Sequence, residues 1–139
     1  MYSVRVADEF KRSTNWYNVF LDFHDYKLWN DKPNYFGRDE KYFHDEIWHI
    51  HITTDPVRQQ AWSKQPDMYR RTNSLNDPQN DFFLLYGKDE VREQYLMLAL
   101  IGPDAHHSSE WRADVTDLYV KVVEPWIFGK RKYDEEPDQ

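Results

Sequence analysis

The chain of 139 residues contains no cysteine. This absence excludes disulfides, thiolate metal ligands and cysteine nucleophiles, so any catalysis must use other side chains, and it fits a reducing compartment. No apolar run approaches the ~20 residues that a membrane span requires, and the N-terminal residues mix charged with apolar side chains. We therefore expect a cytoplasmic protein with neither a signal peptide nor a membrane span.

A basic surplus is also missing, because 18 Lys and Arg residues face 25 Asp and Glu residues, which gives a net charge of −7. Bulk attraction to nucleic acid normally takes an excess of Lys and Arg, so a nucleic-acid-binding role would require a local basic patch. Part of the acidity lies in the terminal run that begins at Asp134. We expect a single domain at 1–133 and a solvated acidic tail at 134–139.

Hydrophobic residues, in contrast, make up 40% of the chain and aromatic residues 17%. This content is enough for one hydrophobic core and argues against disorder. Hydrophobic periodicity predicts strands at 2–7, 47–53, 82–86 and 95–101, and helices at 14–29 and from 108 to the residue before Pro125. The predicted class is α+β, with the last three strands consecutive and antiparallel.

Two polar segments interrupt this pattern. Residues 30–34 are predicted to be a connection, and the motif Phe36-Gly37-Arg38-Asp39 that follows is predicted to lie on a loop or turn. Residues 55–80 are rich in Pro and Asn and are predicted to be mostly loop, with a short helix near 57–63. Loops of this length are uncommon in compact domains, which favours a role in binding.

The clearest strand carries the sequence Ile-Trp-His-Ile-His-Ile-Thr at 47–53. Its alternation directs Ile50 and Ile52 to one face and His49 and His51 to the other. The two imidazoles can act as acid and base in RNA cleavage, or they can bind zinc together with a third ligand such as His106 or His107. They can equally be polar residues on the solvated face of the strand.

Other residues are candidates for substrate contacts. Arg70, Arg71 and Asn73 combine guanidinium groups with a short polar side chain, as is typical of phosphate-binding loops. Tyr86 ends a core strand, where an exposed aromatic ring can stack on a base. Arg38 can contact a phosphate, whereas we expect a structural role for Asp39.

Taken in order, several short motifs resemble the YafO family. They are Pro33-x-x-Phe36-Gly37-Arg38-Asp39-x-x-Tyr42, His49-Ile50-His51-Ile52, Arg71-Thr72-Asn73, Leu84-Leu85-Tyr86, Leu98-Ala99-Leu100-Ile101 and Pro103-x-x-His106. The resemblance implies a toxin of a type II toxin-antitoxin pair that cleaves messenger RNA on the ribosome and is neutralised by a cognate antitoxin. It also implies a compact RelE-like fold, an antiparallel sheet flanked by helices.

Transferred to this chain, the resemblance singles out Arg38, Asp39, His49, His51, Arg71, Tyr86 and His106. We expect metal-independent attack by the ribose 2′-hydroxyl without a cofactor. In this hypothesis one of His49 and His51 is the base, Arg71 holds the phosphoryl oxygens and His106 is the acid. The ribosome and messenger RNA are the expected partners beside the antitoxin, and an apolar aromatic surface could support a homodimer.

Two alternatives remain open at this point. The His49-x-His51 pair, with His106 and His107, also fits a metal-dependent hydrolase or a metal-binding module. The acidic balance, and Phe83 at a position where the family can carry histidine, fit a non-catalytic relative that binds only its antitoxin.

Overall fold

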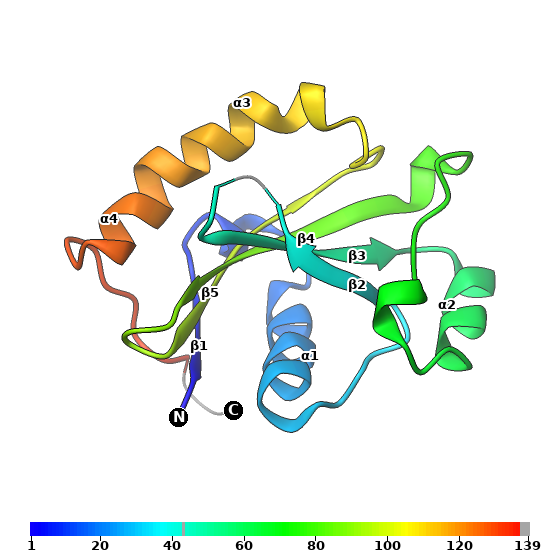
Figure 1. Cartoon of the computed structure of the whole chain (residues 1–139), viewed down its shortest axis with the longest axis horizontal. Helices are drawn as coiled ribbons and strands as arrows, with labels where there is room; N and C mark the ends of the chain where they lie inside the picture. The colour runs from blue at the N-terminus through cyan, green and yellow to red at the C-terminus, as the bar shows by residue number, and fades with distance from the viewer. Residues whose placement is uncertain (43, 137–139) are drawn as a thin grey trace.

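The computed structural model, which describes residues 1–42 and 44–136, contains a five-stranded sheet (Figure 1). In spatial order its strands are β1 (Ser3–Val6), β5 (Gln94–Ile101), β4 (Asp81–Asp89), β3 (Ile47–Thr53) and β2 (Phe36–Lys41). The α+β class is confirmed.

The sheet is mixed, because β1 pairs with β5 in parallel while the other pairs are antiparallel. The expected antiparallel pairing of the later strands is confirmed, and the sheet has in addition one parallel pair, at its β1 edge. After β1 the chain passes through α1 (Trp16–Trp29) and re-enters the sheet at β2, on the opposite edge. No hairpin joins β1 to its neighbour, so nothing forces an antiparallel pairing there.

Helices cover both faces of the sheet. Figure 1 shows α1 on one side, and α3 (Ser108–Leu118) with α4 (Glu124–Ile127) along the other. A π-helical turn, η4 (Tyr119–Val123), joins α3 to α4. The prediction that this helix stops before Pro125 is wrong, because the wide π turn precedes the proline and places it in the first turn of α4, where a missing amide proton costs little.

The alternation within β3 assigns its residues to the two faces. Ile50 and Ile52 belong to the core beneath α1, and Ile47 belongs to the core beneath α3 and α4. His49 and His51 have the same parity as Ile47 and contact Phe83, which belongs to that second core. The prediction that the histidines and the two isoleucines face opposite sides is confirmed.

The predicted loop at Phe36-Gly37-Arg38-Asp39 is instead the start of strand β2. The register between β2 and β3 shifts between Phe36 and Asp39, so this edge strand contains a bulge. Its charged residues conceal the alternation that normally marks a strand, since an edge strand buries little of its outer surface.

The polar segment after β3 contains α2 (Pro56–Ser63), which confirms the short helix near 57–63, and two 3-10 turns, η2 (Met68–Arg70) and η3 (Pro78–Asn80). Asp55 caps α2 by accepting a hydrogen bond from the backbone N–H of Val57. The β4–β5 hairpin is also as predicted, although both strands extend further and leave only residues 90–93 to connect them.

The C-terminal segment lies beside β1 (Figure 1). Glu135 forms an isolated antiparallel bridge with Arg5, and the Glu136 carboxylate lies 2.6 Å from the Lys11 ammonium. Residues 137–139 of the predicted acidic tail lie outside the described residues. Among the described residues, no helix is both long enough and apolar enough to cross a membrane.

Candidate active site

Three histidines meet on the face of the sheet that α3 and α4 cover. His49 and His51 come from β3, and His106 comes from the loop between β5 and α3. The ring centroids of His49 and His51 are 5.4 Å apart, and those of His51 and His106 are 5.0 Å apart. All three rings pack around the ring of Phe83, at 4.7, 5.0 and 4.9 Å. We call His49, His51 and His106 the histidine cluster.

Hydrogen bonds fix where each neutral imidazole carries its proton. His49 Nδ1 lies 2.9 Å from the carbonyl oxygen of Glu40, which can only accept, so Nδ1 donates and Nε2 keeps its lone pair. His51 Nδ1 accepts from the backbone N–H of Asn73 at 3.4 Å, so its proton lies on Nε2. His49 therefore offers a proton acceptor and His51 a proton donor.

Burial sets the charge of the two strand histidines. His49 is 7% exposed and His51 is 4% exposed. Burial lowers the pKa of His49 below its ordinary value. Burial, together with the neighbouring His49 and His106, lowers the pKa of His51 to about 3. Both rings are neutral near pH 7.

His106 is more accessible, with 27% of its side chain exposed, and it is held by a buried carboxylate. Its Nδ1 donates to Asp81 Oδ2 at 2.7 Å. Burial alone would raise the pKa of Asp81, but hydrogen bonds from His106 and Asn73 lower it, so Asp81 is ionised. In the neutral ring the His106 proton is therefore on Nδ1, and Nε2 carries the lone pair.

Arg38 brings a positive charge to the same face. Its charge contributes to the lowered pKa of His51, and its Nε donates to the carbonyl oxygen of Tyr69 at 2.7 Å. The Arg38 guanidinium also lies over the Tyr69 ring, 3.8 Å from the centroid. Arg38 is half-buried, and it is the one predicted site arginine whose charge acts on His51.

The matching family model is described as "Toxin YafO, type II toxin-antitoxin system", and the match covers residues 24–129. The chain belongs to the YafO toxin family. No curated protein and no solved structure matches the chain. The α+β arrangement is consistent with the RelE-like fold expected for a YafO toxin, and membership implies a cognate antitoxin as partner.

Within this YafO-family fold, Arg71 is not placed as a phosphate ligand. Its side chain is buried, with 4% exposure, and its guanidinium donates to three backbone carbonyl groups. The acceptors are the carbonyl oxygens of Gln65 at 2.8 Å, Pro33 at 3.1 Å and Phe36 at 3.0 Å. These bonds tie the long polar segment to the start of β2, so Arg71 positions backbone rather than substrate.

Tyr86 lies on the opposite face of the sheet and is 1% exposed, so it cannot stack on a base there. Its hydroxyl donates to Asp39 at 2.6 Å. The same carboxylate accepts hydrogen bonds from Lys27 at 2.6 Å and Tyr26 at 2.8 Å. This polar network connects α1 to β2 and β4, which corresponds to the structural role expected of Asp39.

Of the other predicted residues, one contacts the histidine cluster and two pair with residues elsewhere. Asn73 is buried and contacts both His51 and Asp81. Arg70 lies at the end of η2 with 74% of its side chain exposed and pairs with Asp67. His107 is 66% exposed and pairs with Asp104. Asn73 thus belongs to the site, whereas Arg70 and His107 lie outside it.

No group of three or more His, Cys, Asp or Glu side chains among the described residues is arranged to hold a metal ion. The backbone N–H of Asn73 donates to His51 Nδ1 and leaves the proton of this neutral ring on Nε2, so His51 offers no lone pair to a metal ion on its other side. The metal-binding alternative therefore receives no support from the geometry.

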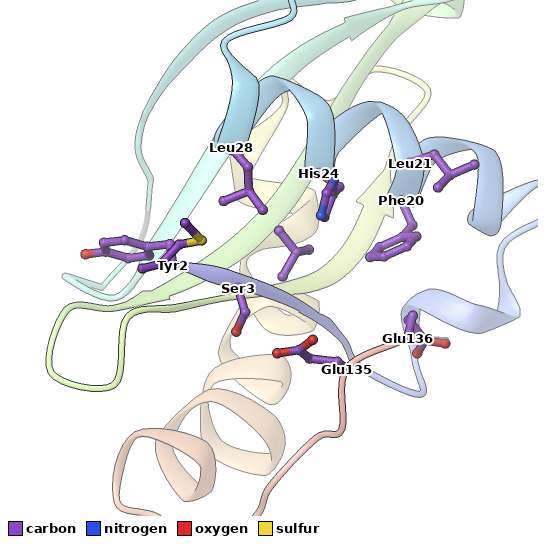
Figure 2. Close-up of a pocket in the computed structure, with 10 residues that line it drawn as sticks. Tyr2, Ser3, Phe20, Leu21, His24, Leu28, Glu135 and Glu136 are labelled. Atoms are coloured by element: carbon purple, nitrogen blue, oxygen red, sulfur yellow. The ribbon is translucent and has the colours of Figure 1, made fainter. Parts of the chain in front are cut away.

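A separate hollow of about 380 Å³ lies between β1, α1 and the C-terminal segment. Figure 2 shows Phe20, Leu21 and Leu28 of α1 on one side of it and Glu135 and Glu136 on another. No residue of the histidine cluster lines this hollow. It is therefore distinct from the candidate active site.

Two residues of the site were not predicted from the sequence. Asp81 opens β4, and its parity with Phe83 was the available signal, since alternate residues of a strand share a face. Tyr69 supports Arg38 from a 3-10 turn, and no periodicity in the polar segment marks it.

Proposed function

We propose that this YafO-family toxin is an endoribonuclease of the cytoplasm that cleaves messenger RNA on the ribosome, and that the histidine cluster is its active site. The observation that carries this proposal is the convergence of three imidazoles with different environments on one face of the sheet. His49 and His51 are buried and neutral, while His106 is partly exposed and paired with a carboxylate. Groups whose environments differ in this way are suited to acid and base roles in one reaction.

In the proposed reaction the ribose 2′-hydroxyl attacks the adjacent phosphorus atom. His49 Nε2, whose lone pair is free because Nδ1 donates to Glu40, takes the hydroxyl proton. His106, whose Nδ1 Asp81 holds, gives a proton from Nε2 to the leaving 5′-oxygen. The products are a 2′,3′-cyclic phosphate and a 5′-hydroxyl end.

Two further groups stabilise the charge that develops on the phosphoryl oxygens. His51 is neutral and directs an N–H at Nε2 away from the Asn73 backbone, so it donates a hydrogen bond without first needing a proton from solvent. Arg38, rather than Arg71, supplies the positive charge. One positioned arginine serves this purpose even though the net charge is −7.

The proposal is tested by inducing the protein in growing cells and mapping the ends of cleaved transcripts. We expect growth arrest and breaks with 5′-hydroxyl ends on ribosome-bound messages. Purified protein should cleave programmed ribosomes equally well with and without a chelator, which separates this reaction from metal-dependent hydrolysis. Co-sedimentation with ribosomes without cleavage would instead identify a non-catalytic relative.

A further inference from the structure

We infer that Asp81 and Asn73 together position the histidine cluster. Asp81 holds His106 so that Nε2 faces the substrate, and Asn73 sets His51 in the opposite tautomer. This inference rests on the proposed function only for its effect on catalysis. Neither residue need touch the RNA, because both act through the two histidines.

The Asp81 carboxylate is buried, and both of its oxygens accept hydrogen bonds. It is 1% exposed. Its Oδ2 accepts from both the backbone N–H of His106, at 2.9 Å, and the ring Nδ1–H of the same residue, at 2.7 Å. Holding the backbone and the ring of one residue by one oxygen restricts rotation of the imidazole.

Asn73 fixes the other half of the carboxylate. Its amide Nδ2 donates to Asp81 Oδ1 at 2.8 Å and to the carbonyl oxygen of Ile52 at 3.0 Å. The amide group therefore ties Asp81 to the end of β3, the strand that carries the other two histidines. The carboxylate cannot rotate away from His106 without breaking these bonds.

The backbone of Asn73 completes the arrangement, because its N–H donates to His51 Nδ1 at 3.4 Å. One residue therefore contacts both His51 and the partner of His106. It favours a proton on Nε2 of His51 while Asp81 favours a proton on Nδ1 of His106. The two rings, 5.0 Å apart, thus present one N–H and one lone pair when both are neutral.

The test uses ¹⁵N NMR of the histidine side chains in the intact protein, with assignments from single His→Gln variants. In the parent protein we expect neutral His106 to carry its proton on Nδ1 and neutral His51 on Nε2. Asp81→Asn, which keeps shape but removes the charge, should move the His106 proton to Nε2 or to a mixture of both tautomers. A parent His106 protonated on Nε2, or an unchanged spectrum in Asp81→Asn, overturns the inference.

Kinetics on ribosome-bound message provide a second readout. Asp81→Asn should lower kcat by about 100-fold or more while KM changes less than about threefold, as expected when an orienting carboxylate is lost. When His106 is already replaced by Gln, Asp81→Asn should lower kcat little further. If Asp81 had only a structural role, Asp81→Asn would lower kcat by the same factor in the parent and in His106→Gln.

The NMR spectrum and the cleavage assay test different claims. A protein that cleaves no RNA defeats the proposed function but leaves the tautomers to be read from the spectrum. A protein that cleaves RNA but shows the wrong His106 tautomer defeats the positioning role alone. If Asp81→Asn does not fold, the parent spectrum and Asn73→Ala, which keeps the backbone N–H to His51, still decide the result. Asn73→Ala should alter the His106 signals more than those of His51.

Discussion

The guanidinium of Arg38 lies over the ring of Tyr69, with 3.8 Å between its central carbon and the ring centroid. A hydrogen bond of 2.7 Å from Arg38 Nε to the Tyr69 carbonyl oxygen fixes the same pair. The arginine of the candidate site is therefore oriented by η2, part of the long polar segment. Tyr69 itself is 58% exposed, so one side of this pair is open to solvent.

We predict that Arg38→Lys reduces the rate of RNA cleavage by about 10-fold or more, because a lysine neither stacks on Tyr69 nor donates two bonds to a phosphate. Tyr69→Leu should reduce it by a smaller factor. Arg12→Ala, an exposed arginine in the 3-10 turn η1 (Phe10–Arg12), is the matched control and should cleave normally. Cleavage by Arg38→Lys at the parent rate would remove Arg38 from the site.

Arg71→Gln is predicted to destabilise the fold rather than to remove chemistry. The three carbonyl groups that Arg71 now satisfies would lose their donors, so we expect the free energy of unfolding to fall by roughly 2 to 4 kcal/mol. Urea unfolding measures this change, with exposed Arg70→Gln as the control. Normal stability combined with lost cleavage would restore Arg71 as a phosphate ligand.

The pKa of His51 predicts a dependence of stability on pH. The folded pKa of about 3 lies below the ordinary value of 6.5, so between these values the unfolded chain binds a proton that the folded chain does not. Stability should therefore fall as the pH drops from 6.5 towards 3, by up to about 1.4 kcal/mol per pH unit. His51→Gln should show a shallower slope in urea unfolding at pH 7, 6 and 5, and an identical slope would contradict the burial of a neutral His51.

Gly37→Ala is predicted to be destabilising because the added Cβ would lie 2.3 Å from the Arg71 carbonyl oxygen and 2.9 Å from the Trp62 ring. The first contact is with backbone, so the segment that holds Arg71 must shift. We expect a loss of about 1 to 3 kcal/mol, measured by thermal or urea unfolding. Lys41→Ala, at the exposed end of the same strand, should change stability far less.

The sequence was sufficient for elements whose hydrophobic pattern is regular. The alternation around His49 and His51 predicted β3 and the shared face of the two imidazoles, and the apolar runs predicted the β4–β5 hairpin. It was insufficient where the pattern is polar or the backbone irregular. Edge strand β2 carries charged residues in a pattern that is typical of a loop, and the π turn before Pro125 leaves no periodic signal.

The candidate site could likewise be predicted only in part. The order of motifs predicted that His106 belongs with the strand histidines. The structural role of Arg71 could not be predicted, because it depends on carbonyl groups of Pro33 and Phe36, which are far away in the sequence. A short sequence pattern cannot show that a guanidinium group will donate its hydrogen bonds to backbone carbonyl groups. The face of Tyr86, in contrast, follows from alternation within β4, because Tyr86 shares its parity with Leu84 and not with Phe83.

The central claim is that the histidine cluster performs RNA cleavage, and the most direct measurement is the single-turnover rate of cleavage on programmed ribosomes. His49→Gln and His106→Gln should each lower this rate by about 100-fold or more, with folding verified by thermal unfolding. His107→Gln, the adjacent but outward-facing histidine, should cleave within about twofold of the parent. Cleavage by folded His49→Gln and His106→Gln at the parent rate would contradict the account.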